Sequence, residues 1–444
     1  MATGPISSDW LGNNFAPKGQ RRWQDYLWLT GFLVLPFVSY LGLAILLVLS
    51  LVSWRQQRGQ LLAWLWQQGY GWLSLGFLVS AGAAAYPGDA FLQTANFLPY
   101  FLMLGALVVR YGGTPYARRI QQLTVLALAL VLTSLPFSLL AIVEYGIKFP
   151  TVAAQVDGWW VFRWAFDVSF VGHRAHGTLG HPNILSAYLV MVVSLGLGLL
   201  GATLAQAKPS TERWSGVAIA TLAGLIGIFC TGSRNGLLIA VIQILVFTLC
   251  VQRQRWLQIT GLSLIGALGV GALSLGVGGR HLGLELITQD PRLEVWEIAL
   301  NLARHRPILG WGLGGFGHLY IPQSVTNHEH VHHAHNLWLY LASEVGIPMT
   351  LGFCWVIGRV LYRTAREILQ PSITAQPLAT QSRSIITSYL MAFSGCMLFG
   401  LFDVPLFDVR INALGWLLLA CLYLATPQVP GVTPAAITNK GQGR

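Results

Sequence analysis

Histidine is concentrated in one part of this 444-residue chain. All eleven histidines lie between His173 and His335, and the last five occur in the run H-E-H-V-H-H-A-H-N at residues 328–336. Histidine changes protonation near neutral pH, and it can act as an acid, a base or a metal ligand. The distribution therefore predicts a single chemical centre that is built from two stretches of the chain.

His335 is the histidine whose neighbours point to a catalytic position. Asn336 follows it and can cap a helix that begins at Leu337, which places His335 at the mouth of a helical bundle. The other histidines of the run could bind a metal. However, Glu329 is the only carboxylate close to them in the sequence, and no cysteine is near. We therefore expect no metal and interpret them as part of a solvated loop.

Isolated arginines stand in short polar segments between apolar runs. Arg234 lies in the turn T-G-S-R-N-G, and Arg292 follows an Asp-Pro pair that predicts the start of an amphipathic helix. Arg174, His181 and Asn183 precede another apolar run. A guanidinium can bind phosphate through two parallel hydrogen bonds, so these groups are candidates for binding an anionic substrate. The alternative for Arg234 is a side chain that only reaches toward the membrane surface.

Three further features could bind a substrate or hold helices together. The glycine-rich run at residues 308–317 could direct N–H groups at a phosphate or form a flexible hinge. Glu344 is a carboxylate within an apolar run, which makes it a functional candidate by default. It could pair with Arg410, which lies close to Asp403 and Asp408 in a turn that could equally be an ion-pair lock between helices.

The elements that carry these residues are predicted to be membrane helices. The chain is 54% hydrophobic and only 10% charged, and apolar runs of about 20 residues recur along it. The sequence thus predicts an all-α, polytopic membrane protein with about twelve transmembrane helices. The first stretch, from Tyr26 to Trp54, could be one long helix or two short helices that are separated near Pro36.

The distribution of charge favours two short helices. Both termini are then cytoplasmic, and two thirds of the 27 Lys and Arg residues lie on the cytoplasmic side, as expected for membrane proteins. The net charge of +11 thus reflects membrane topology and not a surface that binds nucleic acid. We expect one transmembrane domain, residues 1–427, with large outer loops at 146–183 and 280–336, and a polar cytoplasmic tail at 428–444. All histidines lie in the two outer loops.

Four motifs in this order resemble the O-antigen ligase and O-antigen polymerase superfamily of bacterial envelope proteins. They are G-T-L-G-H-P-N-I-L-S-A-Y, then T-G-S-R-N-G, then R-L-E-V-W-E-I-A-L with P-I-L-G-W-G-L-G-G-F-G, and finally H-N-L-W-L-Y-L-A-S-E-V-G. Together they span roughly residues 170–360. The turn D-V-P-L-F-D-V-R-I-N-A-L-G-W also resembles a cyanobacterial branch once labelled as inorganic carbon transporters.

The resemblance implies a glycosyltransferase of the bacterial inner membrane that needs neither a metal nor a cofactor. Such enzymes take a glycan from undecaprenyl diphosphate at the periplasmic face and transfer it to a lipid A core sugar, another glycan repeat or a protein hydroxyl. The motif positions correspond to Arg234, to Arg292 and to the element formed by His335, Asn336, Glu344 and Gly346. The arginines would stabilise the leaving diphosphate, and His335 would be the base in an inverting transfer.

The main alternative is a transporter of bicarbonate or another small anion. A transport path should place polar residues in the middle of the membrane. In this chain the ionisable residues gather in the outer loops, and the centres of the apolar runs are nearly free of charge. This pattern favours an enzyme that acts on a lipid carrier at the membrane surface. Ligase and polymerase remain equally compatible with the sequence.

Overall fold

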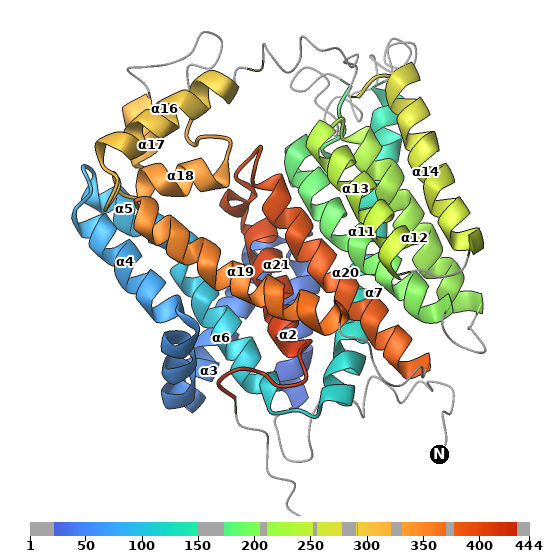
Figure 1. The fold of residues 1–444 in the computed structure, drawn as a ribbon, viewed down its shortest axis with the longest axis horizontal. Helices are drawn as coiled ribbons and strands as arrows, with labels where there is room; N and C mark the ends of the chain where they lie inside the picture. The colour runs from blue at the N-terminus through green and yellow to red at the C-terminus, as the bar shows by residue number, and fades with distance from the viewer. Residues whose placement is uncertain are drawn as a thin grey trace, which may run out of the picture.

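The computed structural model describes residues 22–148, 173–204, 211–251, 255–277, 290, 292–320, 331–369 and 377–432. These residues form helices and turns without an extended strand, which confirms the predicted all-helical class (Figure 1). The elements are, in chain order, α2 (Arg22–Val34), α3 (Ser39–Gln68), α4 (Tyr70–Gly82), α5 (Pro87–Gln93), η1 (Thr94–Asn96), α6 (Leu98–Gly112), α7 (Tyr116–Ile147), η2 (Gly177–Leu179), α11 (Pro182–Leu204), α12 (Thr211–Cys230), α13 (Arg234–Val246), the π-helical η3 (Phe247–Val251), α14 (Arg255–Ser274), α16 (Arg292–His305), α17 (Gly315–Tyr320), α18 (Leu337–Glu344), α19 (Ile347–Leu369), α20 (Pro377–Phe399), η5 (Pro405–Phe407) and α21 (Val409–Leu424).

Two helices occupy the first apolar stretch, as the charge distribution favoured. The chain turns between Val34 and Ser39, around Pro36, which has no backbone N–H to continue a helix. The second helix, α3, is longer than expected and continues to Gln68 with a kink at Gln57. Arg55 and Arg58, which follow the apolar stretch that ends at Trp54, therefore lie within α3.

Among the described residues, four helical segments are long and apolar enough to cross a membrane: Ser39–Gln68, Pro87–Gly112, Tyr116–Ile147 and Pro182–Leu204. The expected number of about twelve spans is not confirmed, because several apolar runs form shorter helices. The run at 337–358 is an example, since it divides into α18 and α19 at Gly346, which has a left-handed φ of 84°. A side chain is excluded there, because a Cβ atom on Gly346 would lie 2.1 Å from the carbonyl oxygen of Ile308.

The core of the bundle is formed by α11 and α21. In α21 every residue from Ile411 to Leu424 is buried. In α11, 83% of the most apolar 18-residue stretch is buried. α11 packs along α20, α12 and α7, whereas α21 packs on α6 and α20. The segment after α21 also packs on the bundle, since the Trp64 indole N–H donates to the carbonyl oxygen of Pro430 at 2.9 Å. Most of the predicted tail, residues 433–444, lies outside the described residues.

The polar segments that the sequence assigned to one face meet at one end of the bundle, the upper end in Figure 1. The Ala175 N–H donates to the Cys230 oxygen at 2.9 Å, and the Leu337 N–H donates to the Gly400 oxygen at 2.7 Å. We call this the site end, and the end that holds Arg119 the opposite end. Residues 149–172, 278–289 and 321–330 of the predicted outer loops, with His328 and His330, lie outside the described residues.

Candidate active site

Two helices begin at one cavity at the site end. Ser233 caps α13, because its hydroxyl accepts the Gly236 N–H at 3.3 Å. Asp290 caps α16, because its carboxylate accepts the Arg292 N–H at 3.0 Å, as the sequence predicted. The first turn of a helix presents N–H groups and a partial positive charge, so both helix starts favour an anion in the cavity.

Arginine side chains make this cavity cationic. It has a volume of about 320 Å³ and contains three predicted candidates, Arg174, Arg234 and Arg292. Within the described parts of the chain, the guanidinium groups of Arg234 and Arg292 have no hydrogen-bond or ion-pair partner. The residues that line the cavity are Arg174, Asn183, Gly232, Ser233, Arg234, Asn235, Asp290, Arg292, Leu293, Trp296 and Phe402. Since Asp290 is the only acidic residue among them, the lining suits an anion that carries more than one negative charge.

Arg174 connects the cavity to the turn between α20 and α21. Its Nη2 donates to Asn183 Oδ1 at 2.7 Å, and its Nε donates to the Thr231 carbonyl oxygen at 2.9 Å. Asn183 Nδ2 in turn donates to Asp403 Oδ2 at 2.8 Å. The two predicted residues, Arg174 and Asn183, therefore lie together, and a chain of hydrogen bonds leads from Arg174 to Asp403.

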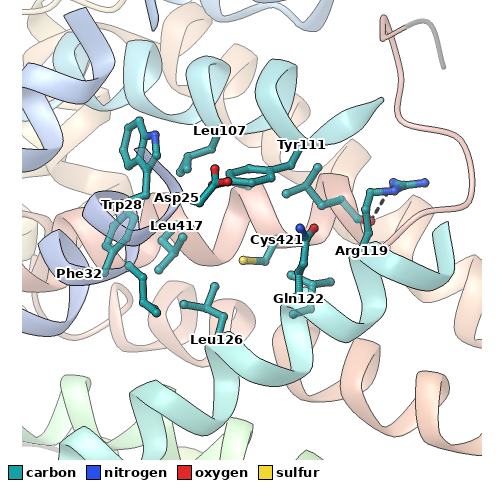
Figure 2. Close-up of a pocket in the computed structure, with 14 residues that line it drawn as sticks. Asp25, Trp28, Phe32, Leu107, Tyr111, Arg119, Gln122, Leu126, Leu417 and Cys421 are labelled. Carbon is teal, nitrogen blue, oxygen red and sulfur yellow. Dashed lines mark hydrogen bonds between the residues drawn. The ribbon is translucent and has the colours of Figure 1, made fainter. Parts of the chain in front are cut away.

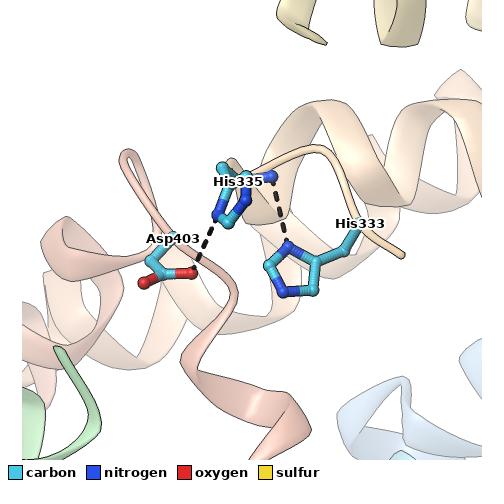
Figure 3. A group of neighbouring side chains, drawn as sticks. All are labelled: His333, His335 and Asp403. Atoms are coloured by element: carbon cyan, nitrogen blue, oxygen red, sulfur yellow. Dashed lines mark hydrogen bonds and ion pairs between the residues drawn. The ribbon is translucent and has the colours of Figure 1, made fainter. Parts of the chain in front are cut away.

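Asp403 is also the partner of His335. Nδ1 of His335 lies 3.4 Å from Asp403 Oδ1 (Figure 3). His335 has a left-handed φ of 47°, a backbone conformation that side chains other than glycine rarely adopt and that often marks a functional site. Asn336 is the predicted helix cap, because its side chain accepts the N–H groups of Trp338 and Leu339 at 3.0 Å. The cap fixes the position of His335 at the start of α18.

The charge on Asp403 determines which nitrogen of His335 holds the proton. Burial opposes ionisation of Asp403, but the hydrogen bonds and positive charge of His335, with the hydrogen bond from Asn183, hold the pKa of this carboxyl well below its usual range. An ionised carboxylate can only accept a hydrogen bond. Nδ1 of His335 must therefore donate, and in the neutral ring Nε2 keeps a lone pair that can accept a proton.

Two more histidines lie close to this pair. The His335 N–H donates to Nδ1 of His333 at 3.3 Å, and the His333 ring stacks on Phe407 with 5.3 Å between ring centres. Burial lowers the pKa of His333 to about 4. The predicted residue His181 accepts the Asn183 N–H at 3.2 Å, and burial lowers its pKa also, although the charge on Asp403 opposes this. Burial therefore favours the neutral form of both flanking rings.

The same group offers ligands of the types that metals prefer. One ligand atom each from His333, His335 and Asp403 lies within 4.8 Å of the others. Two imidazoles and a carboxylate could hold a transition metal. The expectation of no metal was based on the sequence around Glu329, and it did not include the distant Asp403.

The geometry and the sequence agree with a known family. Residues 217–354 match the family model described as O-antigen ligase. The resemblance to the O-antigen ligase and polymerase superfamily is confirmed. No curated protein matches the chain. The O-antigen ligase match includes Arg234, Arg292 and His335, whereas Arg174 and Asp403, which the fold brings to them, lie outside the matched residues. The match gives no support to a transporter.

Glu344 also lies within the O-antigen ligase match, but it does not line the cavity. Its side chain is fully buried, and Oε1 accepts the Phe316 N–H at 2.5 Å. The glycine-rich run wraps around it, and the Gly312 N–H donates to the main-chain oxygen of Glu344 at 2.7 Å. This run therefore directs N–H groups at a carboxyl residue of the chain itself. The N–H groups of Gly312 and Phe316 are therefore bound to Glu344 and not free for a phosphate, whereas a hinge at this run stays a prediction.

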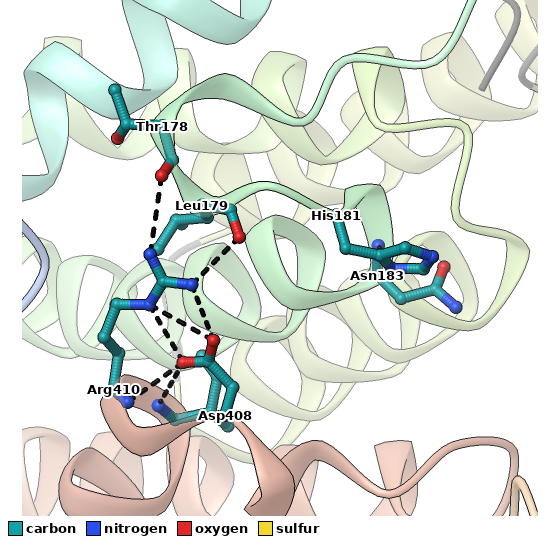
Figure 4. Close-up of polar contacts among 7 residues, drawn as sticks. Thr178, Leu179, His181, Asn183, Asp408 and Arg410 are labelled. Carbon is teal, nitrogen blue, oxygen red and sulfur yellow. Dashed lines mark hydrogen bonds and ion pairs between the residues drawn. The ribbon is translucent and has the colours of Figure 1, made fainter. Parts of the chain in front are cut away.

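The partners of Arg410 lie in the turn between α20 and α21 and in the segment before α11, and Glu344 is not among them. Its guanidinium binds Asp408, with a shortest distance of 2.6 Å, and donates to the carbonyl oxygens of Thr178 and Leu179 (Figure 4). The suggested pair between Arg410 and Glu344 is therefore wrong. The ion pair of Arg410 is with Asp408, the cap of its own helix, and is therefore not a lock between helices; the hydrogen bonds to Thr178 and Leu179 join α21 to the segment that precedes α11.

One buried carboxylate that supports the site, Glu144, was not predicted from the sequence. Glu144, near the end of α7, is fully buried and lies 2.7 Å from Lys148 Nζ. Its Oε2 accepts the N–H groups of His176 and Gly177 at 3.0 and 2.7 Å. Glu144 thereby fixes the segment that carries Arg174. An acidic residue at the end of an apolar run was the available signal, by the same reasoning that selected Glu344.

A second cavity, at the opposite end of the bundle, is smaller than the first and mostly apolar (Figure 2). Its volume is about 70 Å³, and most of its lining is apolar, including Trp28, Phe32 and Leu417. Arg119 borders it, but the guanidinium donates to three main-chain carbonyl oxygens and is thus already paired. This small apolar cavity does not provide the chemistry that the site end provides.

Proposed function

We propose that this protein transfers a glycan from undecaprenyl diphosphate to an acceptor hydroxyl at the periplasmic face of the bacterial inner membrane, with both termini in the cytoplasm. The acceptor is a lipid A core sugar or another glycan. The O-antigen ligase match over residues 217–354 supports this class of reaction. The observation that carries the proposal is a cavity with three arginines that is joined through Asn183 and Asp403 to His335.

The cationic cavity is suited to the diphosphate of the donor. Breaking the bond between sugar and diphosphate leaves negative charge on the phosphate oxygens. Guanidinium groups and helix N-termini that are fixed before the reaction stabilise this charge without reorganising. Arg174, Arg234 and Arg292 would thus provide what a divalent cation provides in other phosphate chemistry. We therefore propose a metal-independent transfer.

His335 is the proposed base. The acceptor oxygen attacks the anomeric carbon, its proton passes to Nε2 of His335, and the bond between the anomeric carbon and the diphosphate oxygen breaks with its electron pair on the diphosphate. Asp403 holds the ring through Nδ1 and stabilises the imidazolium that results. Attack from the side opposite the leaving group inverts the configuration at the anomeric carbon.

The decisive experiment is to measure transfer by purified His335→Gln protein with a lipid-linked glycan and a hydroxyl acceptor, in the presence of a metal chelator. We expect the transfer rate to fall by about 10²–10⁴-fold, the usual contribution of a general base. The matched control is His305→Gln, because His305 is exposed on α16 and binds only the Asn301 main-chain oxygen in the described structure. It should transfer at the wild-type rate.

Two results would contradict the proposal. Full transfer by well-folded His335→Gln protein would exclude His335 as the base. Loss of wild-type transfer on chelation, with recovery after a divalent metal is added, would exclude a metal-independent reaction and would indicate that His333, His335 and Asp403 hold a metal. Supplying a lipid A core sugar in one reaction and a glycan repeat in another separates a ligase from a polymerase.

A further inference from the structure

The cationic cavity has an aromatic wall that the proposed chemistry does not use. Trp296 from α16 and Phe402 from the turn after α20 both line it, and their ring centres lie 6.2 Å apart with an angle of 42° between the rings. Leu293 extends this apolar surface. We call these three residues the aromatic wall. A diphosphate alone is small and highly charged, and it has no apolar surface that could pack on this wall.

Trp296 also presents a donor without an acceptor. Its indole Nε1 is buried, and no hydrogen-bond partner lies near it among the described residues. In contrast, the indole N–H groups of Trp64, Trp311 and Trp416 donate to oxygens at 2.9, 2.9 and 2.7 Å. Leaving a buried donor unpaired is unfavourable, so an acceptor is expected from a bound ligand. That acceptor must lie against the indole of Trp296.

The aromatic wall lies where the reacting sugar must be. Trp296 is four residues after Arg292 on α16, so both side chains project from the same face of the helix. Phe402 directly precedes Asp403, the partner of His335. The wall therefore extends from an arginine of the proposed diphosphate site to the turn that orients the proposed base. A group held there sits between leaving group and base.

We propose that the aromatic wall binds the sugar ring that is attached directly to the diphosphate, an inference that rests on the proposed function. A pyranose presents one face of C–H groups, which packs on an aromatic ring, and hydroxyl oxygens that can accept the Trp296 N–H. The first isoprene unit of the carrier is the competing occupant. It offers no acceptor oxygen, and the buried Nε1–H therefore favours the sugar.

The test compares two ligands that differ only in the sugar. Undecaprenyl diphosphate and undecaprenyl diphosphate-glycan are each titrated against full-length protein in lipid nanodiscs. We expect Trp296→Leu to weaken binding of the glycan-linked carrier about tenfold and to leave the sugar-free carrier unchanged. Trp296→Phe, which keeps a ring but removes the donor, should weaken the glycan-linked carrier about threefold. The control is Trp355→Leu, an exposed tryptophan on α19, which should change neither affinity.

The outcomes separate this inference from the proposed function. If Trp296→Leu weakens both carriers equally, the aromatic wall contacts the isoprenoid or only supports the fold, and the sugar assignment is wrong. If Trp296→Leu weakens neither carrier, the assignment is also wrong, whereas the proposed function stands as long as wild-type protein binds the carriers. If wild-type protein binds neither carrier, the proposed function itself fails.

Discussion

Arginines at the two ends of the bundle have contrasting environments. At the opposite end, Nη2 of Arg110 lies 2.7 Å from Asp25 Oδ1, and Arg119 donates to three main-chain carbonyl oxygens at and just after the end of α21. At the site end, Arg234 and Arg292 line a cavity of about 320 Å³, and no partner for either guanidinium lies within the part of the chain that the structure describes. Arg110 and Arg119 are therefore paired within the protein, as are Arg174 and Arg410 at the site end, whereas Arg234 and Arg292 have no such partner among the described residues.

We interpret this contrast as a difference between arginines that stabilise the fold and arginines that are proposed to bind a ligand. A buried cation is tolerated only when opposite charge or acceptor oxygens surround it. Arg110 and Arg119 meet this condition within the chain itself. Arg234 and Arg292 are only partly buried, so water can hydrate their guanidinium groups. Composition alone cannot make this distinction, because all four residues contribute equally to the net charge of +11.

The largest expected effect is on catalysis at the site end. Arg234→Ala and Arg292→Ala should each lower the transfer rate by about 10²–10³-fold, since each removes a charge that stabilises the leaving diphosphate. The thermal unfolding midpoint should stay close to that of the wild type. Arg234→Lys, which keeps the charge but not the bidentate geometry, should retain intermediate activity. Wild-type transfer rates in both alanine variants would show that Arg234 and Arg292 do not stabilise the leaving diphosphate.

Replacing the arginines at the opposite end should lower stability and leave the transfer rate unchanged. Arg119→Ala removes the donor to three carbonyl oxygens, and Arg110→Ala leaves the buried Asp25 without its cationic partner, although the Tyr111 hydroxyl still donates to it. Each change should cost about 3 kcal/mol of stability and lower the midpoint of thermal unfolding, while transfer per folded molecule persists. Arg58→Ala, at an exposed position of α3, is the control and should change neither quantity. An unaltered midpoint for Arg119→Ala would show that its contacts contribute little.

The smallest effect concerns pH and again belongs to the site end. Burial lowers the pKa of His333 to about 4, below the ~6.5 expected in an unfolded chain. Below about pH 6.5 the unfolded state binds a proton that folded His333 does not accept until about pH 4. Stability should therefore fall with decreasing pH across this window, by at most ~1.4 kcal/mol per pH unit.

Replacing His333 should reduce this pH dependence. The thermal unfolding midpoint of His333→Gln should fall less than that of the wild type between about pH 7 and about pH 5. Arg119→Ala should keep the wild-type slope from a lower starting midpoint, because a guanidinium does not titrate in this range. Equal slopes for wild-type and His333→Gln protein would show that the neutral form of His333 does not contribute to stability.

Local features of the chain were predictable because they depend on neighbouring residues. The break near Pro36, the Asp290 start of α16 and the Asn336 cap of α18 all follow from backbone chemistry within a few positions. The motifs also selected Arg234 and Arg292, which the fold places in one cavity. The number of spans was less predictable, because hydropathy cannot show where an apolar run is divided by a turn such as that at Gly346.

By itself, the sequence determined the helical class, the clustering of histidine and arginine in polar segments, and the family to which those segments are similar. Only the tertiary structure decided which of these groups meet. It brings Asp403 into contact with His335, although the two residues are 68 positions apart in the sequence. It also packs Glu344 against the glycine-rich run and pairs Arg410 with Asp408. The physical reason is that a helix start or a turn depends on local hydrogen bonds. The partner of a charged side chain instead depends on which helices pack together, and this is set by burial over the whole bundle.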